Sequence, residues 1–567
     1  MKMDKRKKLI VFSMAVGMFL CMLDTTVMNI ALPKVQTGLH VSLEDLSWAL
    51  NIYTIVFAVF TIPFGRIADI VGRNRVYVVG LILFACGSFF SGAATTAPFL
   101  IVGRGIQSLG AAIVFPASMT IGIATNSFQD RTKVLATLGV TQGIAAALGP
   151  TIGGVVTQYL GWRYIFFINI PLVIFVIISC GILLPMKAEK VTNPRIDVWG
   201  MLLSMGMLLS LTLVLVKGND WGWESRPVVE LIGMVLIAFV LFILVERRTA
   251  APMIPLGLFK DRQFVGASLA VILTGVFLVA IMVIMPTFFT RVLNKSELVA
   301  AFMITPTSAM IFVFSPIGGL LIGKIGPRLM VSLGFLAMIG GYMTLAVINP
   351  SHYNELVISL LLIGAGYGVI AGPVVVLGAS KFTGELLSAS QSVLGLFRQI
   401  GTLLAVAIFV SALTTNLKAA QNQSVIQANT RIEAASIPHT EKVTFKRQAN
   451  NAIHHDGVTS KQSAGTTGAA VSAVIHRQYE ATLKMMPHYQ FLDHEQKVKL
   501  YHAVASKVTT KIQNQMMTVR FIQRQVVGQT RKNMKVAFMK PYRQAIPFII
   551  VAGFSSLLFD RKKDYCG

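Results

Sequence analysis

The feature that most constrains this chain is a series of apolar segments of about 20 residues. They recur from residue 9 to the C-terminus and are separated by short polar or charged turns. Such a segment crosses the roughly 30 Å hydrocarbon core of a bilayer as a helix, and a helix satisfies its own backbone polar groups there. Apolar residues form 54% of the chain, charged residues 13%, and the mean hydropathy is +0.68. The sequence therefore predicts an all-α integral membrane protein.

The apolar pattern predicts fourteen spans. Lys and Arg cluster in alternate connections, and the positive-inside rule then places both termini in the cytoplasm, which requires an even number of spans. The last span is the weakest, because its strictly apolar part runs only from Ala545 to Phe559. The predicted spans are 9–32, 46–65, 76–96, 98–122, 134–158, 163–184, 196–216, 228–245, 263–289, 298–322, 329–348, 355–378, 390–414 and 541–559.

A weak internal repeat divides the spans into two halves. The stretch GRIADIVGRNR follows the second span, and GLLIGKIGPR follows the tenth with Gly323 in the position of Asp69. This repeat is typical of a two-bundle transporter that opens a central site alternately to each side. The predicted organisation is 1–186 as a six-helix bundle, 187–262 as two linking helices, 263–414 as helices 9–13, 415–540 as a basic, partly helical extracellular insert, and 541–567 as the last helix and a cytoplasmic tail.

Asp24 lies inside the first span, where a carboxylate raises the free energy of membrane insertion by at least about 2.5–3.5 kcal/mol. Such an acid usually has a function, although a purely structural ion pair is the alternative. At 1.5 Å per residue, Asp24 lies roughly 12 Å and Arg104 roughly 9 Å from the same membrane face, so we expect the two to share a polar network. Burial would favour the protonated form of Asp24 and Arg104 its ionised form. That competition would let the acid take up and release a proton.

Span 5 contains GVTQGIAAALGPTIGG, with Gly143, Gly149, Pro150, Gly153 and Gly154 on one helix. Small residues at these spacings allow close helix approach, and the proline bends the helix. Helix packing alone would explain Gly149 and Gly153 but explains the whole combination less well.

The turn GRIADIVGRNR carries Gly65, Asp69, Gly72, Arg73 and Arg75. A generic basic anchor would need neither the acid nor glycines at fixed offsets. We therefore expect a gating latch, in which Asp69 bonds helix N-termini or arginines across the two halves in the outward-facing state.

Several segments together resemble one known family. They are LDTTVMNIALP, GRIADIVGRNR, RGIQSLGAA, LGPTIGG, WRYIFFINIP and RQIGTLLAVA, in this order along residues 1–414. They are similar to the fourteen-helix drug:proton antiporters of the major facilitator superfamily. The resemblance implies the two-bundle fold, a bacterial plasma membrane, export driven by proton entry, and small amphipathic, often cationic substrates. It also implies that Asp24 and Arg104 couple protons and that Asp69 and Arg73 gate.

The chain departs from the family pattern in two places, of which the first is a mild change and the second limits the substrate class. Ser108 stands where the family commonly has glycine, and apart from Asp24 no acid lies well inside a span. Related exporters of divalent organic cations use further membrane carboxylates. Monovalent lipophilic cations and neutral or zwitterionic amphiphiles are therefore favoured here.

Catalysis and nucleotide use are not predicted. The chain has no HExxH zinc motif and no GxxxxGK[ST] phosphate loop, and its histidines and cysteines suggest no metal site. We expect no enzyme activity, no cofactor and no nucleic-acid partner, with protons and membrane lipids as the partners besides substrate. An ion gradient must supply the energy.

The insert carries about half of the net charge of +26. Residues 415–545 contribute +13 and seven of the nine histidines, and parity places them outside the cell. Residues 415 to about 467 are polar and expected to be loosely ordered. From Asp493, with Gln496 as its capping partner, apolar residues at steps of three and four predict an amphipathic helix of about 30 residues. It would pack on a partner helix near 470–485, or else lie on the outer leaflet or touch an anionic envelope polymer.

The leading hypothesis is a proton-coupled exporter of amphipathic drugs. A dedicated exporter of one metabolite, lipid or antibiotic on the same scaffold is the first alternative. The second, of another class, is a membrane-anchored sensor or envelope-binding protein that acts through its insert, which Asp24, Arg104 and Asp69 argue against because a scaffold would not need them.

Overall fold

The computed structural model describes residues 4–41, 43–126, 130–185, 196–350, 352–435, 437–455, 468–486 and 493–562. These residues are almost entirely helical and contain no strand. The chain forms two compact units. The first comprises Met1–Leu413 with Met539–Gly567, and the second comprises Thr414–Phe538.

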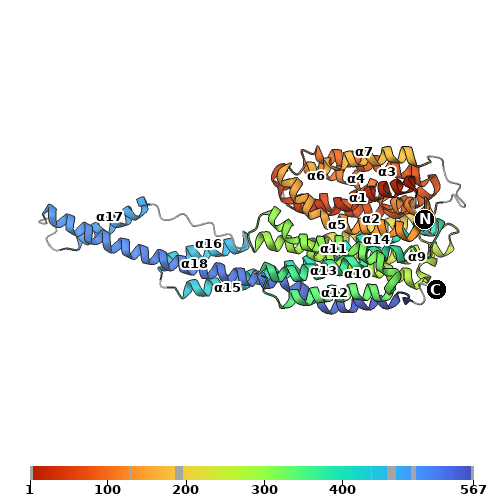
Figure 1. Ribbon diagram of the computed structural model, residues 1–567. Coiled ribbons are helices and arrows are strands. Elements are labelled where there is room, and N and C mark those ends of the chain that lie inside the picture. The colour runs from red at the N-terminus through yellow and green to blue at the C-terminus, as the bar shows by residue number, and fades with distance from the viewer. Residues whose placement is uncertain are drawn as a thin grey trace. The chain divides into compact units, whose positions relative to one another are not determined.

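The helices of the first unit run side by side along a common direction (Figure 1). Several begin with a side chain that caps free backbone N–H groups. Thr96 and Asp261 accept hydrogen bonds from Phe99 N (3.4 Å) and Phe264 N (2.8 Å). The helices of its N-terminal part are α1 (Lys5–Leu39), α2 (Leu43–Val71), α3 (Arg73–Gly92), α4 (Ala97–Ala124), α5 (Arg131–Tyr159), α6 (Tyr164–Phe167) and α7 (Asn169–Leu183).

Two linking helices and a second set of long helices follow in the first unit. The linking helices are α8 (Val198–Trp221) and α9 (Arg226–Arg248), followed by the short η2 (Leu256–Lys260). The second set comprises α10 (Arg262–Arg291), α11 (Glu297–Ile325), α12 (Pro327–Val347), α13 (Tyr353–Leu377) and α14 (Gly384–Ala405), which a π-helical turn, η3 (Val406–Val410), continues.

The internal repeat is visible in the helix pairing. In the first half α1 packs on α5, and α4 packs on both α2 and α3. In the second half the corresponding helices pair in the same way, α10 with α14 and α13 with α11 and α12. Between the halves, α5 packs on α11 and α14 packs on α2, which are again equivalent contacts. The linking pair joins through α8, which packs on α2 and α14.

Twelve helices of the described residues are long and apolar enough to cross a membrane, and thirteen if the two parts of α5, bent by 46°, count as one span. The fourteenth predicted span, 541–559, is not among them because its apolar part is short. It nevertheless belongs to the first unit. Tyr542 is fully buried, its hydroxyl donates to the Ala280 carbonyl oxygen (3.3 Å), and Phe559 is fully buried.

A charged cluster fixes the chain after this last segment. Lys381 Nζ lies 3.0 Å from Asp261 Oδ2 and 3.4 Å from Asp560 Oδ2. Partial burial lowers the pKa of Lys381, but the hydrogen bonds and charges of the two aspartates outweigh it and leave the pKa above its usual value. The lysine therefore stays protonated and links the start of α10, at Asp261, to the C-terminal segment, at Asp560.

The second unit contains all but the first three residues of α15 (Ser411–Glu433), together with α16 (His439–His455), α17 (Gly468–Lys484) and most of α18 (His494–Gly553). The expected loose order from 415 to about 467 is wrong for the described residues, while 456–467 lie outside them. Polar side chains cover most of α15 and α16, yet a few apolar residues form a small core with α18 and hold them as helices. That core contains Ala428, Ile432, Ile453, Ile522 and Val526.

The predicted start of the amphipathic helix is confirmed. Gln496 N donates to Asp493 Oδ1 (2.7 Å) and Asp493 N donates to Gln496 Oε1 (3.2 Å), a reciprocal capping box. The helix is about twice as long as expected, because α18 continues for 60 residues. Near its start, Tyr501 contacts Tyr479 of α17 edge to face, with ring centroids 5.3 Å apart.

Candidate functional site

The structure brings Asp24 and Arg104 together inside the first half. Asp24 lies on α1 and Arg104 on α4, and Arg104 Nη1 forms an ion pair with Asp24 Oδ2. The exposed fractions are 5% for Asp24 and 1% for Arg104. A buried ion pair is tolerated only where the remaining polar atoms of both groups are also bonded.

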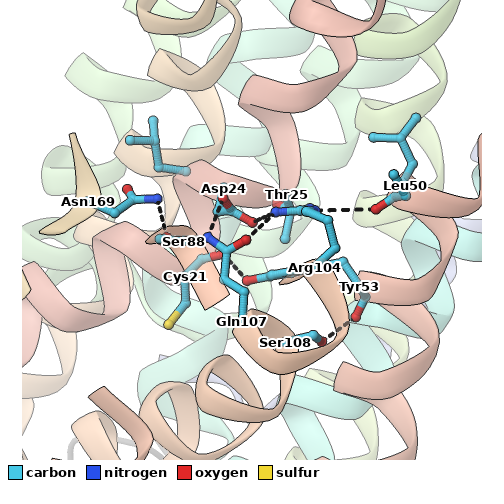
Figure 2. A network of polar contacts seen from close by, with 12 residues as sticks. Cys21, Asp24, Thr25, Leu50, Tyr53, Ser88, Arg104, Gln107, Ser108 and Asn169 are labelled. Atoms are coloured by element: carbon cyan, nitrogen blue, oxygen red, sulfur yellow. Dashed lines mark hydrogen bonds and ion pairs between the residues drawn. The ribbon is translucent and has the colours of Figure 1, made fainter. Parts of the chain in front are cut away.

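Gln107 meets that requirement, as Figure 2 shows. Its Nε2 donates to Asp24 Oδ1 (2.9 Å) and to Ser88 Oγ (2.7 Å), while its Oε1 accepts from Arg104 Nη1 (2.7 Å). Asn169 on α7 extends the network by donating to Ser88 Oγ (3.1 Å). Both carboxylate oxygens of Asp24 are therefore occupied. The sequence reasoning missed Gln107, although its position three residues after Arg104 places both on one helix face.

The guanidinium of Arg104 also contacts the aromatic ring of Tyr53, which lies on α2. Arg104 Cζ lies 4.3 Å from the centroid of the Tyr53 ring, within cation–π range. Arg104 Nε donates to the Ala49 carbonyl oxygen (3.2 Å), so two contacts to α2 remain independent of Asp24. Ser108, which departs from the family pattern, donates to the Tyr53 carbonyl oxygen (2.5 Å) and so ties α4 to the same helix.

A second polar cluster, the gate cluster, lies where α2 ends and α14 begins. Arg66 Nη1 lies 2.8 Å from Glu385 Oε2 and joins the two halves directly. Asp69 Oδ1 accepts from Arg73 Nε (2.7 Å), and Asp69 also hydrogen-bonds Ser388 of α14. The gate cluster comprises Arg66, Asp69, Arg73, Gly384, Glu385 and Ser388.

The gate cluster matches the predicted latch only in part. Asp69 pairs with an arginine of its own half and reaches the other half through Ser388, while Arg73 Nη2 donates to the Gly384 carbonyl oxygen (3.4 Å). The direct ion pair across the halves uses Arg66 and Glu385, which the sequence reasoning did not single out as gating residues. The sequence did contain a signal for this pair, because Glu385 lies in the first turn of a helix that follows a basic connection.

The motif glycines of this turn have steric reasons. A methyl group on Gly65 would lie 2.5 Å from Ser392 Oγ of α14, and Gly72 has φ 114°, a conformation that side chains disfavour. Arg75 is exposed on α3.

The glycines of α5 serve two different interfaces. A methyl group on Gly149 would lie 1.7 Å from Thr26 Oγ1, and one on Gly153 would lie 2.9 Å from the Val27 carbonyl oxygen, both on α1 just after Asp24. One on Gly154 would lie 3.0 Å from Ala301 Cβ of α11. Pro150 lies inside the second arm of the bent helix. A methyl group on Gly143 would also meet α11, at 3.3 Å from Ile311 Cγ2.

A cavity of about 300 Å³ adjoins the gate cluster. Its walls come from α2, from α14 and from residues 250–255, which connect α9 to η2. The connection from the linking helices thus reaches the contact between the two halves. The described residues contain no group of three or more metal-ligating side chains.

Comparisons with known proteins agree with this architecture. The multidrug transporter protein MdtP of Bacillus subtilis is 30% identical over 410 residues, covering 71% of this chain and 75% of that protein. The riboflavin transporter RibZ of Clostridioides difficile is 28% identical over 372 residues, covering 65% of this chain and 80% of that protein. The crystal structure of the human organic anion transporter MFSD10 superposes with a TM-score of 0.52 at 13% identity, covering 72% of this chain and 94% of that one, and supports the fold alone.

The sequence profile described as Major Facilitator Superfamily matches residues 14–406, well over half of the chain. Together with the repeated helix pairing, this match identifies a multi-pass membrane transporter rather than an enzyme. The chain therefore belongs to the major facilitator superfamily.

Proposed function

We propose that this transporter is an efflux antiporter of the plasma membrane, which exports small amphipathic compounds in exchange for protons, with both termini in the cytoplasm. The observation that carries the proposal is the buried Asp24–Arg104–Gln107 network. An ionisable pair inside a span is costly and is typically retained for function.

The network suggests how the proton would be handled. While Asp24 holds Arg104 and Gln107, both oxygens of its carboxyl group are bonded. If α1 moves away from α4 as the site opens, the carboxylate loses its counter-ion in a desolvated place and takes up a proton. Arg104 keeps its hydrogen bond to Ala49 and its contact with Tyr53. The guanidinium therefore stays in place until Asp24 releases the proton and pairs with it again.

The charge inventory supports the substrate class. Asp24 is the one acid well inside a span of the sequence. A single carboxylate that serves both proton and substrate can offset one positive charge, which favours monovalent lipophilic cations or neutral amphiphiles. No cofactor is needed, because the proton gradient supplies the energy.

The test uses inside-out membrane vesicles with an imposed pH gradient and a panel of monovalent, divalent and neutral amphiphiles. We expect some compounds to release protons in the wild type and none to do so in Asp24→Asn. The matched control is Glu230→Gln, which removes an exposed acid paired with Arg226 on α9 and should behave as the wild type. Undiminished proton release in Asp24→Asn would refute the assignment of Asp24.

A dedicated exporter of a single compound is the second candidate, favoured by the similarity to a protein named a riboflavin transporter. The same vesicle assay distinguishes a dedicated exporter from a drug exporter. In a dedicated exporter only one compound class should release protons, and the other compounds of the panel should not compete for its transport.

A further inference from the structure

Two buried carboxyl groups lie at the junction of the linking helices, away from Asp24. Asp197 caps the start of α8, and its Oδ1 accepts from Gly200 N (2.9 Å). Its side chain is 7% exposed, and its Oδ2 has no hydrogen-bond partner among the described residues.

Glu246 lies in the last turns of α9 and holds the connection that follows. Its Oε1 accepts from Met253 N (3.1 Å) and Ile254 N (3.3 Å). The side chain is 4% exposed, and its Oε2 is likewise without a partner among the described residues.

The two carboxyl groups meet over Gly200. A methyl group placed on this glycine would lie 2.4 Å from Asp197 Oδ2 and 3.1 Å from Glu246 Oε1. The described part of the chain supplies no Lys or Arg ion pair to either acid. Two buried like charges at such range are not both retained without a counter-charge, and a shared proton is the smallest group that satisfies them.

Among the other charged groups near the pair in the sequence, Arg195, two residues before Asp197, lies outside the described residues. The segment 249–255 contains no ionisable residue. Arg247 and Arg248 follow Glu246 on α9 and are exposed, and Lys260 and Asp261 lie beyond the connection. Across the cavity, α2 and α14 present Arg66, Asp69 and Glu385.

We propose that Asp197 and Glu246 form a second proton-binding site, which holds one proton between the two carboxyl groups and keeps segment 250–255 docked against the gate cluster. The docked segment buries Ala251, Met253 and Ile254 and closes one wall of the gate cavity. Loss of the proton leaves two carboxylates side by side, and their repulsion releases the segment that Glu246 holds. The linking helices thereby sense pH and act on the contact between α2 and α14.

The test measures the docking directly and needs no transported compound. Spin labels are placed at Gly257→Cys, where an added Cβ meets no atom within 4 Å, and at Thr383→Cys, an exposed residue whose side chain makes no capping bond. Cys86 and Cys566 are replaced by Ser in the same protein. The distance between the labels is recorded by pulsed electron paramagnetic resonance across a pH series in nanodiscs.

We expect the ratio of docked to released protein to fall about tenfold or more as pH rises, because a proton bound tenfold more tightly in the docked form shifts the equilibrium by that factor. In Glu246→Gln and Asp197→Asn the docked distance should persist at every pH, since neither pair can become doubly charged. Glu230→Gln, on the same helix as Glu246 and in an exposed ion pair, should keep the wild-type transition.

Infrared difference spectroscopy supplies an independent readout of the proton. A protonated carboxyl band should be present in the docked form of the wild type and absent from both variants. A pH transition that persists in Glu246→Gln, or one that follows Na⁺, K⁺ or Ca²⁺ concentration instead of pH, would overturn the proposal. Because antiport is not measured, failure here is distinguishable from failure of the Asp24 mechanism.

Discussion

At the scale of single residues, the protein depends on how each buried charge is satisfied. Asp24 and Arg104 form a closed network in which Gln107 bonds both partners and Tyr53 stacks on the guanidinium. The acid and the base were predictable from sequence, because any charge inside an apolar span demands a partner. Gln107 was not, because an amide inside a span has many possible partners until the helices are placed.

Removing Arg104 alone should therefore be more harmful than removing both charges. Arg104→Gln leaves Asp24 buried without its counter-ion and should lower stability by about 3–5 kcal/mol. The double variant Asp24→Asn/Arg104→Gln should recover more than half of that loss, since no unpaired charge remains. Unfolding of the purified variants in detergent, combined as a double-mutant cycle, measures the coupling. Equal losses in the single and double variants would show that the two charges do not stabilise each other.

At the scale of elements, the glycines of α5 allow this helix to pack closely against two neighbouring helices. Gly149 and Gly153 admit α1, whereas Gly143 and Gly154 lie against α11 of the other half. The sequence indicated close packing but not which partner each glycine meets, because the helical period fixes faces and leaves the neighbours open. The gate cluster shows the same limit, since Glu385 became a partner of Arg66 only when α14 was placed beside α2.

Gly149→Ala should be destabilising, because its methyl group would overlap Thr26 Oγ1 and force α1 and α5 apart. Overpacking of this kind costs about 1–3 kcal/mol. Gly181→Ala on α7 is the matched control, since a methyl group there meets no atom within 4 Å and favours the helix. Thermal unfolding in detergent should rank Gly149→Ala well below the wild type and Gly181→Ala at or above it. The reverse order would contradict the packing of α5 on α1.

At the scale of the whole molecule, the chain consists of a membrane unit and a basic helical unit inserted before the last segment. Each has apolar residues of its own to bury, and the core of the second unit draws on α15, α16 and α18. The network of Asp24 and the gate cluster both lie entirely in the first unit.

Replacing residues 415–538 with a flexible linker should therefore leave proton-coupled transport in place. The vesicle assay with the most active compound of the panel is the measurement, and the linker variant that also carries Asp24→Asn is the control. Complete loss of activity in a variant that still folds in the membrane would instead favour a sensor or envelope-binding protein that acts through residues 415–538.

The sequence by itself determined the membrane class, the two repeated halves, the buried acid with its basic partner and the capping box of α18. Each follows from local rules, namely the length of an apolar segment, the cost of a charge in hydrocarbon and the free N–H groups at a helix start. Only the tertiary structure decided the helical order of α15 and α16, the use of Arg66 and Glu385 at the gate, and the meeting of Asp197 with Glu246. These depend on contacts between residues far apart in the chain, where the side chains brought together by packing, and not the local pattern, set the energy.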